Sequence, residues 1–298
     1  MRRRAAPSRT YLRSVPSMAR VQIRDINLLR FLSSAVLLGF CGLVLLHVVA
    51  DVMYMDPVTI LDLVRSSRIQ SAFVVSFVTS ITATAISLAV AVPAAYALSR
   101  YEFRGKMALD ILVDLLIVLP TLVIGMNVLV LFRLAGDMTE SSFFLMRWLG
   151  RASEAATDFF IFSVPGIVLA QFLCAVSFAI RAIKATFDGI DPRKESVAMT
   201  LGCSPLGAFR RVTLPLAKPG IMAGGLLSWA RAFGAFGAVK IVGGTIKGRT
   251  EILPTTIYLE VEVGNINNAL GVALIILFSA AAVLVCVRLV SGKSVFGT

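Results

Sequence analysis

The sequence predicts an all-α membrane protein with six transmembrane helices, and two observations lead to this fold class. First, hydrophobic residues make up 57% of the 298 residues and charged residues only 15%, whereas soluble domains are about 25% charged. The mean hydropathy is +0.86. Second, the apolar residues gather into runs of about 20 residues or more, which is the length of helix that crosses a hydrocarbon core.

Six apolar runs reach this length and divide the chain. Residues 1–30 form a basic segment, residues 31–71 hold the first helix and an external loop, and residues 72–290 form a core of five helices. Residues 291–298 are a short tail. The predicted spans are Phe31–Ala50, Ala72–Leu98, Leu109–Leu134, Ile161–Ile180, Pro219–Val242 and Ala269–Leu289.

The distribution of Lys and Arg predicts which side of the membrane each loop faces, because these residues are enriched in cytoplasmic loops. Twenty of the 29 lie on the side that carries both termini and the loop 181–218, and seven lie on the opposite side. We therefore expect this loop and both termini to be cytoplasmic, in a cell inner or plasma membrane. The net charge of +12 is spread over these flanks, so we expect no nucleic-acid partner.

The first 24 residues contain no acid and several Arg and Ser residues, a composition that transit peptides share. We favour an ordinary basic flank of the first helix, and the apolar run that follows is longer than the 7–15 residues of a secretory signal. The cysteines form no C-x-x-C pair and no cluster with His, so neither a metal site nor a disulfide framework is expected. They are Cys41, Cys174, Cys203 and Cys286.

A polar loop precedes the fifth predicted span. Asp191 and Pro192 are typical of a helix start, Gly202 favours a helix end in the left-handed region, and Ser204 can cap a second short helix. Two prolines are expected to break the chain before the span, Pro215 and Pro219. The pattern predicts a helix–Gly–helix elbow, and the competing interpretation is an amphipathic loop that lies on the membrane.

The elbow resembles the signature of the inner-membrane permease subunits of binding-protein-dependent ABC importers. That signature reads Glu-Ala-Ala, three residues, Gly, nine residues and Ile-x-Leu-Pro. The chain has its spacing throughout, with Ser196-Val197-Ala198, then Gly202, then Val212-Thr213-Leu214-Pro215. Ser196 stands where the family has Glu, and Glu195 is one position early, which turns it by about 100° on a helix.

The resemblance implies the type I permease fold of methionine and molybdate importers. In that family a short helix of the loop inserts into a groove on a cytoplasmic ATPase and transmits closure driven by ATP. The implied partners are an ATPase dimer that binds ATP and Mg, an extracytoplasmic solute-binding protein and a second copy of the permease, with which it is expected to form a homodimer. The expected ATPase-coupling residues are Glu195, Ser196, Val197, Ala198, Met199, Thr200, Leu201, Gly202, Cys203, Ser204, Pro205, Leu214 and Pro215.

Three segments resemble the permeases for sulfate, molybdate and tungstate in particular. They are Leu98–Pro120, Trp229–Gly244 and Gly248–Asn265. Thr121 follows Pro120 where those permeases often have a second Pro, and Ala235 stands where they often have an acid. The resemblance implies import of one of these tetrahedral oxyanions, with a gate of apolar side chains from the third and fifth spans.

Arg231 lies about halfway along the fifth predicted span, where a cation costs about 2.5–3.5 kcal/mol on insertion scales. A wet cavity, an anion or a partner helix would make it tolerable. We expect Arg231 to face the translocation pathway or a dimer seam; the alternative is an ion pair with Asp110 or Asp114. The residues expected at this pathway or seam are Arg231, Gly234, Phe236 and Gly237.

The sequence lacks the residues of an ATPase or another enzyme. Gly292-Lys293-Ser294 resembles the end of a phosphate-binding loop, but Val287 occupies the position of the required first Gly. Asp110 and Asp114 share one helix face, and we interpret them as a salt-bridge or solvated helix-end pair rather than as catalytic acids. The alternative functions are an ABC permease for another small solute and, less favoured, an ion-coupled secondary transporter. Transporters of the second kind usually show repeated halves, and no repeat is visible in this sequence. We expect no cofactor and no metal in this chain.

Overall fold

The computed structural model describes residues 15–54, 57–136 and 155–291, and these residues form helices joined by turns. The chain divides into two compact units, Met1–Met55 and Asp56–Thr298. The tail, with its Gly292-Lys293-Ser294 sequence, and the first 14 residues of the basic segment lie outside the described residues.

The first unit contains the helix α1 (Val15–Tyr54). None of its side chains between Leu28 and Tyr54 is buried within this chain, and this stretch is long and apolar enough to cross a membrane. An apolar helix without buried side chains needs lipid or a partner protein around it. The first predicted span is therefore confirmed as a membrane-length helix.

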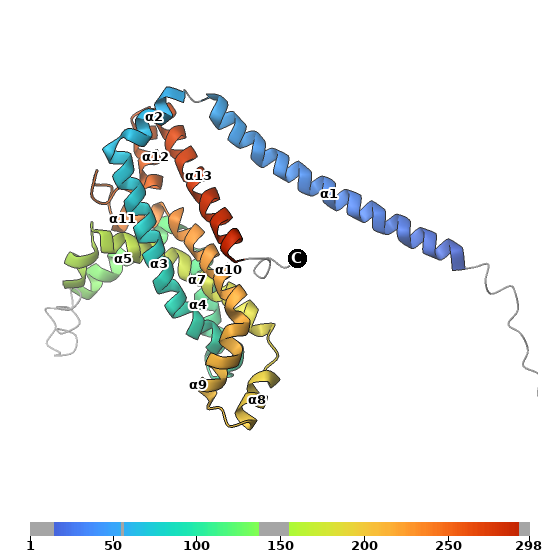
Figure 1. Cartoon of the computed structure of the whole chain (residues 1–298). Helices are drawn as coiled ribbons and strands as arrows, with labels where there is room; N and C mark the ends of the chain where they lie inside the picture. Colours follow the sequence, from blue (N-terminus) through green and yellow to red (C-terminus); the bar gives the residue numbers. More distant parts are fainter. Residues whose placement is uncertain (1–14, 55–56, 137–154, 292–298) are drawn as a thin grey trace, which may run out of the picture. The chain divides into compact units, whose positions relative to one another are not determined.

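The second unit contains the other helices (Figure 1). They are α2 (Pro57–Arg65), α3 (Ser67–Arg100), α4 (Lys106–Val118), α5 (Thr121–Gly136), α7 (Val164–Asp188), α8 (Arg193–Thr200), α9 (Pro205–Ala208), the π-helix η2 (Phe209–Thr213), α10 (Leu214–Phe233), α11 (Gly237–Val242), α12 (Leu253–Glu262) and α13 (Ile266–Ser291). Three of them have membrane length and composition: α3, α7 and α13. They correspond to the second, fourth and sixth predicted spans.

The third predicted span, Leu109–Leu134, is not one straight helix. Lys106–Val118 and Thr121–Leu134 are bent by 116° at the short break between them. Leu119 has φ −63° and ψ 131°, the extended conformation that a following proline imposes, and Pro120 itself offers no N–H to continue the helix. The prediction missed this bend because apolar composition does not record backbone direction.

The fifth predicted span, Pro219–Val242, is also broken. The helix α10 begins earlier, at Leu214, and ends at Phe233, and the short helix α11 starts at Gly237. In the described residues, four continuous helices and one bent pair pass the test of length and apolarity. The structure therefore supports four or five crossings by these criteria, and the count of six is not reproduced.

Small residues bring α3, α7 and α10 together at the centre of the second unit. Ala91 and Ala95 of α3 are buried against Ala179 of α7, and Ala83, Ala175 and Ala232 form a second contact among the same three helices. A Cβ on Gly220 of α10 would lie 1.9 Å from Thr186 Oγ1. Small side chains let backbones approach closely, which stabilises helix packing in a bilayer where water drives little association.

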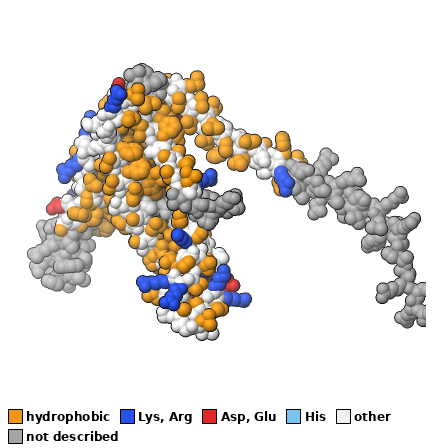
Figure 2. Space-filling model, in the orientation of Figure 1, with side chains coloured by type: hydrophobic (Ala, Val, Ile, Leu, Met, Phe, Trp, Pro, Cys, Tyr) orange, Lys and Arg blue, Asp and Glu red, His pale blue; other side chains and the backbone are white. Residues whose placement is uncertain are grey.

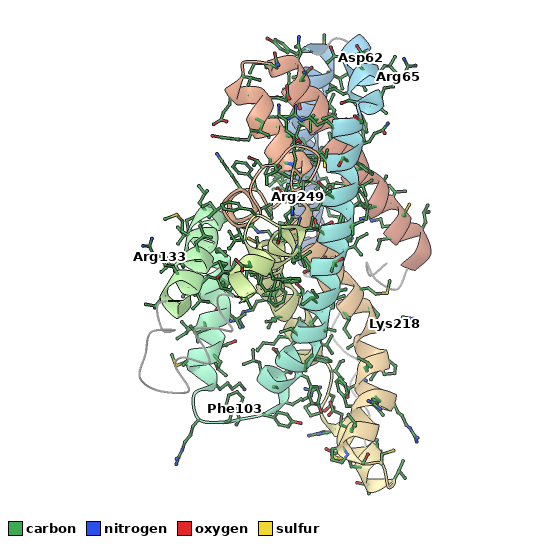
Figure 3. The ribbon with its side chains drawn as sticks, turned by 90° about the vertical axis from the view of Figure 1, so that its left-hand side faces the viewer. Asp62, Arg65, Phe103, Arg133, Lys218 and Arg249 are labelled. Atoms are coloured by element: carbon green, nitrogen blue, oxygen red, sulfur yellow. The ribbon has the colours of Figure 1, made fainter. Side chains whose placement is uncertain are left out.

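The two ends of this unit differ in composition from its middle. Figure 2 shows apolar side chains over much of the middle of the face in view, with Lys and Arg gathered around α8 and α9. Figure 3 shows Lys218 projecting from α10 in the lower half of the view, while Asp62 and Arg65 on α2 lie at the top. An apolar belt between charged ends is what a bilayer requires.

Candidate functional site

The candidate site is the elbow, defined here as residues Asp191–Pro215. Its first helix ends before Gly202 as predicted, but it begins one residue later than expected, with Pro192 as the N-cap and Arg193 as the first helical residue. The Asp191 side chain accepts a hydrogen bond from the backbone N–H of Arg193 at 2.9 Å. At the other end Gly202 has φ +93°, and the N–H of Cys203 donates to the carbonyl of Ala198 at 3.0 Å. This is the left-handed termination that glycine allows without strain.

The second half of the elbow confirms one prediction and corrects another. Ser204 caps α9 by accepting a hydrogen bond from the N–H of Gly207 at 3.1 Å. The chain does not break at Pro215, however, nor at Pro219, which lies inside α10. The π-helix η2 precedes Pro215, and its N–H donor Leu214 bonds five residues back to Phe209. This wider turn accommodates the missing N–H and the ring of Pro215.

Burial on α8 runs opposite to the usual pattern for a helix on a folded protein. Glu195 is the buried residue of α8. Val197 is 58% exposed, Met199 is 41% exposed, and Leu201, which follows the helix, is 81% exposed. Exposed apolar side chains clustered on one element are characteristic of a surface that another protein covers.

Glu195 reaches the end of α3 through two hydrogen bonds. Tyr96 donates its hydroxyl to one carboxylate oxygen at 2.6 Å, and Arg100 donates Nε–H to the other at 3.0 Å. The same guanidinium also donates to the carbonyl of Ile190 at 2.8 Å. Burial alone would raise the pKa of Glu195, but the bonds from Tyr96 and Arg100 outweigh it, so this pKa lies below its usual value of 4.5.

Aromatic rings surround this ion pair. Tyr96 makes edge contacts with Tyr101, Phe187 and Phe209, at centroid distances of 5.8, 5.6 and 4.6 Å. Phe187 comes from α7 and Phe209 from η2, so the rings join α3, α7 and the elbow. The sequence analysis placed Glu195 in the elbow but did not find its partners. The signal in the sequence was Glu195 itself, an acid one position before Ser196, on a short helix whose other side chains are mostly exposed.

A second arginine joins α7 to α4. Arg181 donates Nη1–H to Asp110 at 2.6 Å and Nε–H to Asp114 at 2.6 Å. The salt-bridge interpretation of these two acids is therefore confirmed, but the suggested pairing of either acid with Arg231 is wrong. Arg181 takes that place because α7, and not α10, lies beside this end of α4.

Comparison with known proteins identifies the family. The description "Binding-protein-dependent transport system inner membrane component" matches residues 87–292. The chain belongs to this family. It is 30% identical over 264 residues to the sulfate transport system permease protein CysT of Salmonella typhimurium, which covers 88% of this chain and 91% of CysT.

Two further proteins are similar, one over a shorter and one over a longer part of the chain than CysT. The molybdenum transport system permease protein ModB of Escherichia coli K12 is 34% identical over 191 residues, or 64% of this chain and 79% of ModB. A chain in the crystal structure of a bacterial alginate ABC transporter has a TM-score of 0.65 at 15% identity, over 95% of this chain and 99% of that one. At this low identity, the likeness to the alginate transporter chain shows the fold alone. The protein is an ABC importer permease subunit of the inner membrane, related to sulfate and molybdate permeases.

The permease's Arg231 is exposed on α10. Its guanidinium carbon lies 5.2 Å from the ring centroid of Phe178 on α7, and no carboxylate of the described residues lies within 4.0 Å of it. The face of an aromatic ring attracts a cation held over it.

The predicted neighbours of Arg231 do not share one surface. Gly234 is exposed, Phe236 is half-buried and Gly237 is buried. A Cβ on Gly237 would lie 2.6 Å from Thr121 Oγ1, so this glycine packs against α5. Arg231 and Gly234 share the open face, and the ring of Phe236 packs at a tilt of 39° against Tyr258 of α12, with the centroids 5.3 Å apart. The role of these residues in a pathway or a seam stays a prediction.

An ion cluster at the opposite end of the permease was not predicted. Arg68, near the start of α3, lies 2.6 Å from Glu251 and 2.7 Å from Glu260. The side chains of these acids are 1% and 8% exposed. Burial alone would raise the pKa of Glu260, but its bonds with Arg68 and Asn268 lower it below 4.5. The sequence signal was a pair of acids in the run before the sixth predicted span.

Proposed function

We propose that this permease imports a tetrahedral oxyanion, such as sulfate, molybdate or tungstate, and that its elbow docks on a separate cytoplasmic ATPase. The observation that carries the docking proposal is the reversed burial on α8. The acid Glu195 faces the permease, and Val197, Met199 and Leu201 face outward. A helix that binds only its own chain would bury these three apolar side chains instead.

The position of the elbow favours a protein partner over lipid. The elbow itself carries exposed basic residues, among them Arg193, Lys194, Arg210 and Arg211. Lys and Arg at this density belong to cytoplasmic loops. An apolar groove beside the elbow, lined by Pro93, Tyr96, Tyr101, Pro205 and Leu206 among others, extends the surface that a partner could cover.

The oxyanion proposal rests on similarity to sulfate and molybdenum permeases along most of the chain. The uncompensated charge of Arg231 supports it, because an exposed cation attracts an anion. We propose that the ATPase binds ATP and Mg, that an external binding protein selects the anion, and that two copies of this permease enclose the pathway. ATP-driven closure of the two elbows would open the gate outward.

One substitution tests the docking surface. Leu201→Glu places a carboxylate on the exposed apolar face, and since Leu201 is 81% exposed the fold should tolerate it. We expect affinity for the ATPase to fall by about tenfold or more, measured as the amount of ATPase that co-purifies with the tagged permease. Val263→Glu is the matched control, because Val263 is 69% exposed far from the elbow. Wild-type recovery of the ATPase with Leu201→Glu would refute the docking surface.

A reconstitution tests the substrate. The permease, the ATPase and the binding protein would be placed in liposomes, and ATP hydrolysis would be measured with sulfate, molybdate or tungstate in turn. Stimulation by one of the three is expected. Stimulation by another small solute and by none of these anions would replace the oxyanion assignment, while the permease assignment would stand.

A further inference from the structure

We propose that Glu195 is a positioning residue, and that with Tyr96 and Arg100 it carries the motion of α8 into α3, so that ATP hydrolysis drives solute movement only while this clasp is closed. We call the three side chains the Glu195 clasp. The inference rests on the proposed docking of the elbow to an ATPase, and it adds the route by which the docked helix moves the membrane helices.

The backbone turn that follows α8 is not held in place by neighbouring atoms. Gly202 follows the helix with φ +93°, and nothing lies within 4 Å of the place where its Cβ would be. Gly189 and Pro192 form the turn before the helix. The chain can rotate at a glycine turn that has no neighbours, so the turn after α8 gives a weak link. A bond between side chains connects α8 directly to α3.

Glu195 supplies that bond. Its two hydrogen bonds, from Tyr96 and Arg100, are the side-chain hydrogen bonds between α8 and α3 in the described part of the chain. The other side-chain bonds of α8 stay within the elbow; for example, Thr200 bonds to the carbonyl of Ser196. A pull on α8 thus reaches α3 at the residues that end it.

The clasp is buried, so it is expected to be closed or broken rather than gradually stretched. The side chains of Arg100 and Glu195 are 9% and 11% exposed. Separating a buried charge pair leaves both charges without a partner in a poorly solvated site, which is strongly unfavourable. The bond from Arg100 to the carbonyl of Ile190 ties the entrance of the elbow to the same guanidinium.

Beyond the clasp, helix packing and the ion pairs of Arg181 connect α3 to the bent pair of helices α4 and α5. α3 lies along α7 through Ala91 and Ala95. Arg181 of α7 holds Asp110 and Asp114 at 2.6 Å, near the start of α4. A shift of α3 therefore has contiguous contacts through which to reach the 116° bend between α4 and α5. Contiguity alone is not proof of coupling, so the test measures coupling itself.

The readout is the ratio of ATP hydrolysed to anion delivered, in liposomes that hold the permease with its ATPase and binding protein and with sulfate, molybdate or tungstate outside. We expect Glu195→Gln to raise this ratio about tenfold, and Tyr96→Phe to raise it by a smaller factor, the range over which allosteric coupling usually acts. Glu195→Asp, which keeps the charge, should restore part of the coupling.

Glu102→Gln is the matched control. Glu102 forms an ion pair with Lys106 at 2.6 Å at the same end of the permease, but its side chain is 88% exposed, so its loss should leave the ratio unchanged. A clasp that only stabilises the fold predicts a different outcome, in which hydrolysis and delivery fall together at a constant ratio.

A constant ratio in Glu195→Gln and Tyr96→Phe would overturn the inference. If Glu195→Gln did not assemble with the ATPase, Tyr96→Phe would decide, because it removes a single hydroxyl. Failure of the wild-type permease to show any anion-stimulated hydrolysis would instead reject the proposed function, so the two failures are distinguishable.

Discussion

The two ends of the permease core both use an arginine from α3 to bind acids far away in the sequence, but they use it differently. Arg68 binds two buried acids, and Thr256 and Asn268 add further bonds to them. Arg100 binds one acid, Glu195, on a helix whose other side chains are exposed or half-buried. The first cluster encloses acids inside the core, whereas the second attaches an outward-facing helix to it.

This difference indicates different purposes. At the Arg68 end, α12 buries Leu253 and Glu260 together, and it leaves Val261 50% exposed. In the elbow, the apolar side chains of Val197, Met199 and Leu201 are exposed instead. We therefore expect changes at Arg68 to alter mainly the stability of the permease, and changes in the elbow to alter mainly its assembly and coupling.

The largest expected effect is that of Arg68→Met. It leaves Glu251 and Glu260 buried without their cation, and the free energy of unfolding should fall by about 3 kcal/mol. The measurement is thermal unfolding of the purified permease in detergent. In liposomes with the ATPase and the binding protein, the variant's ratio of ATP hydrolysed to anion delivered should not change. A rise in that ratio equal to the one in Glu195→Gln would remove the contrast between the two ends.

Gly202→Ala and Gly264→Ala form a matched pair. Both glycines have positive φ, +93° and +80°, and neither has a neighbour within 4 Å of the place where a Cβ would be. Each alanine should therefore cost about 1–2 kcal/mol of backbone strain, seen as similar losses of thermal stability. Only Gly202→Ala should reduce ATPase co-purification, because it reorients α8. Equal reductions in both variants would contradict the elbow as the docking element.

A smaller effect is expected from the two serine caps. Ser204 caps α9 in the elbow, and Ser163 caps α7 by accepting a bond from the N–H of Gly166 at 3.2 Å. Replacing either by alanine should lower stability by about 1 kcal/mol. Ser204→Ala should also weaken ATPase binding, measured by titration of the ATPase onto the immobilised permease. If Ser163→Ala weakens ATPase binding as much as Ser204→Ala does, the Ser204 cap has no special role in docking.

The smallest effect concerns pH. Folding lowers the pKa of both Glu195 and Glu260 below 4.5. Each acid therefore contributes stability above its unfolded pKa, and this contribution is lost as the pH falls through the lower, folded pKa. Wild type should be more stable than Glu195→Gln at pH 7, and the two unfolding temperatures should converge only as the pH falls through the folded pKa of Glu195, which is below 4.5. A difference that persists at acid pH would assign the stabilisation to something other than the charge.

Local features of the elbow could be predicted from the residues that form them. The bond that starts α8 at Asp191, the left-handed Gly202 and the Ser204 cap each depend on one side chain and its nearest backbone neighbours. Of the six spans that the apolar runs predicted, four are continuous membrane-length helices in the described residues, because hydrophobic length needs no knowledge of neighbours. The π-helix before Pro215 was missed, since proline was expected to end a helix and not to follow a wider turn.

The amino-acid sequence by itself determined that the chain is an apolar, helical membrane protein with a structured basic elbow, because composition, caps and turns act over a few residues. Only the tertiary structure decided which charges meet. The carboxylates of Asp110, Glu195 and Glu251 are bound by arginines 71, 95 and 183 residues away. Those distances close only when small residues bring α3, α7 and α10 into contact, and the helix ends then place the charges side by side.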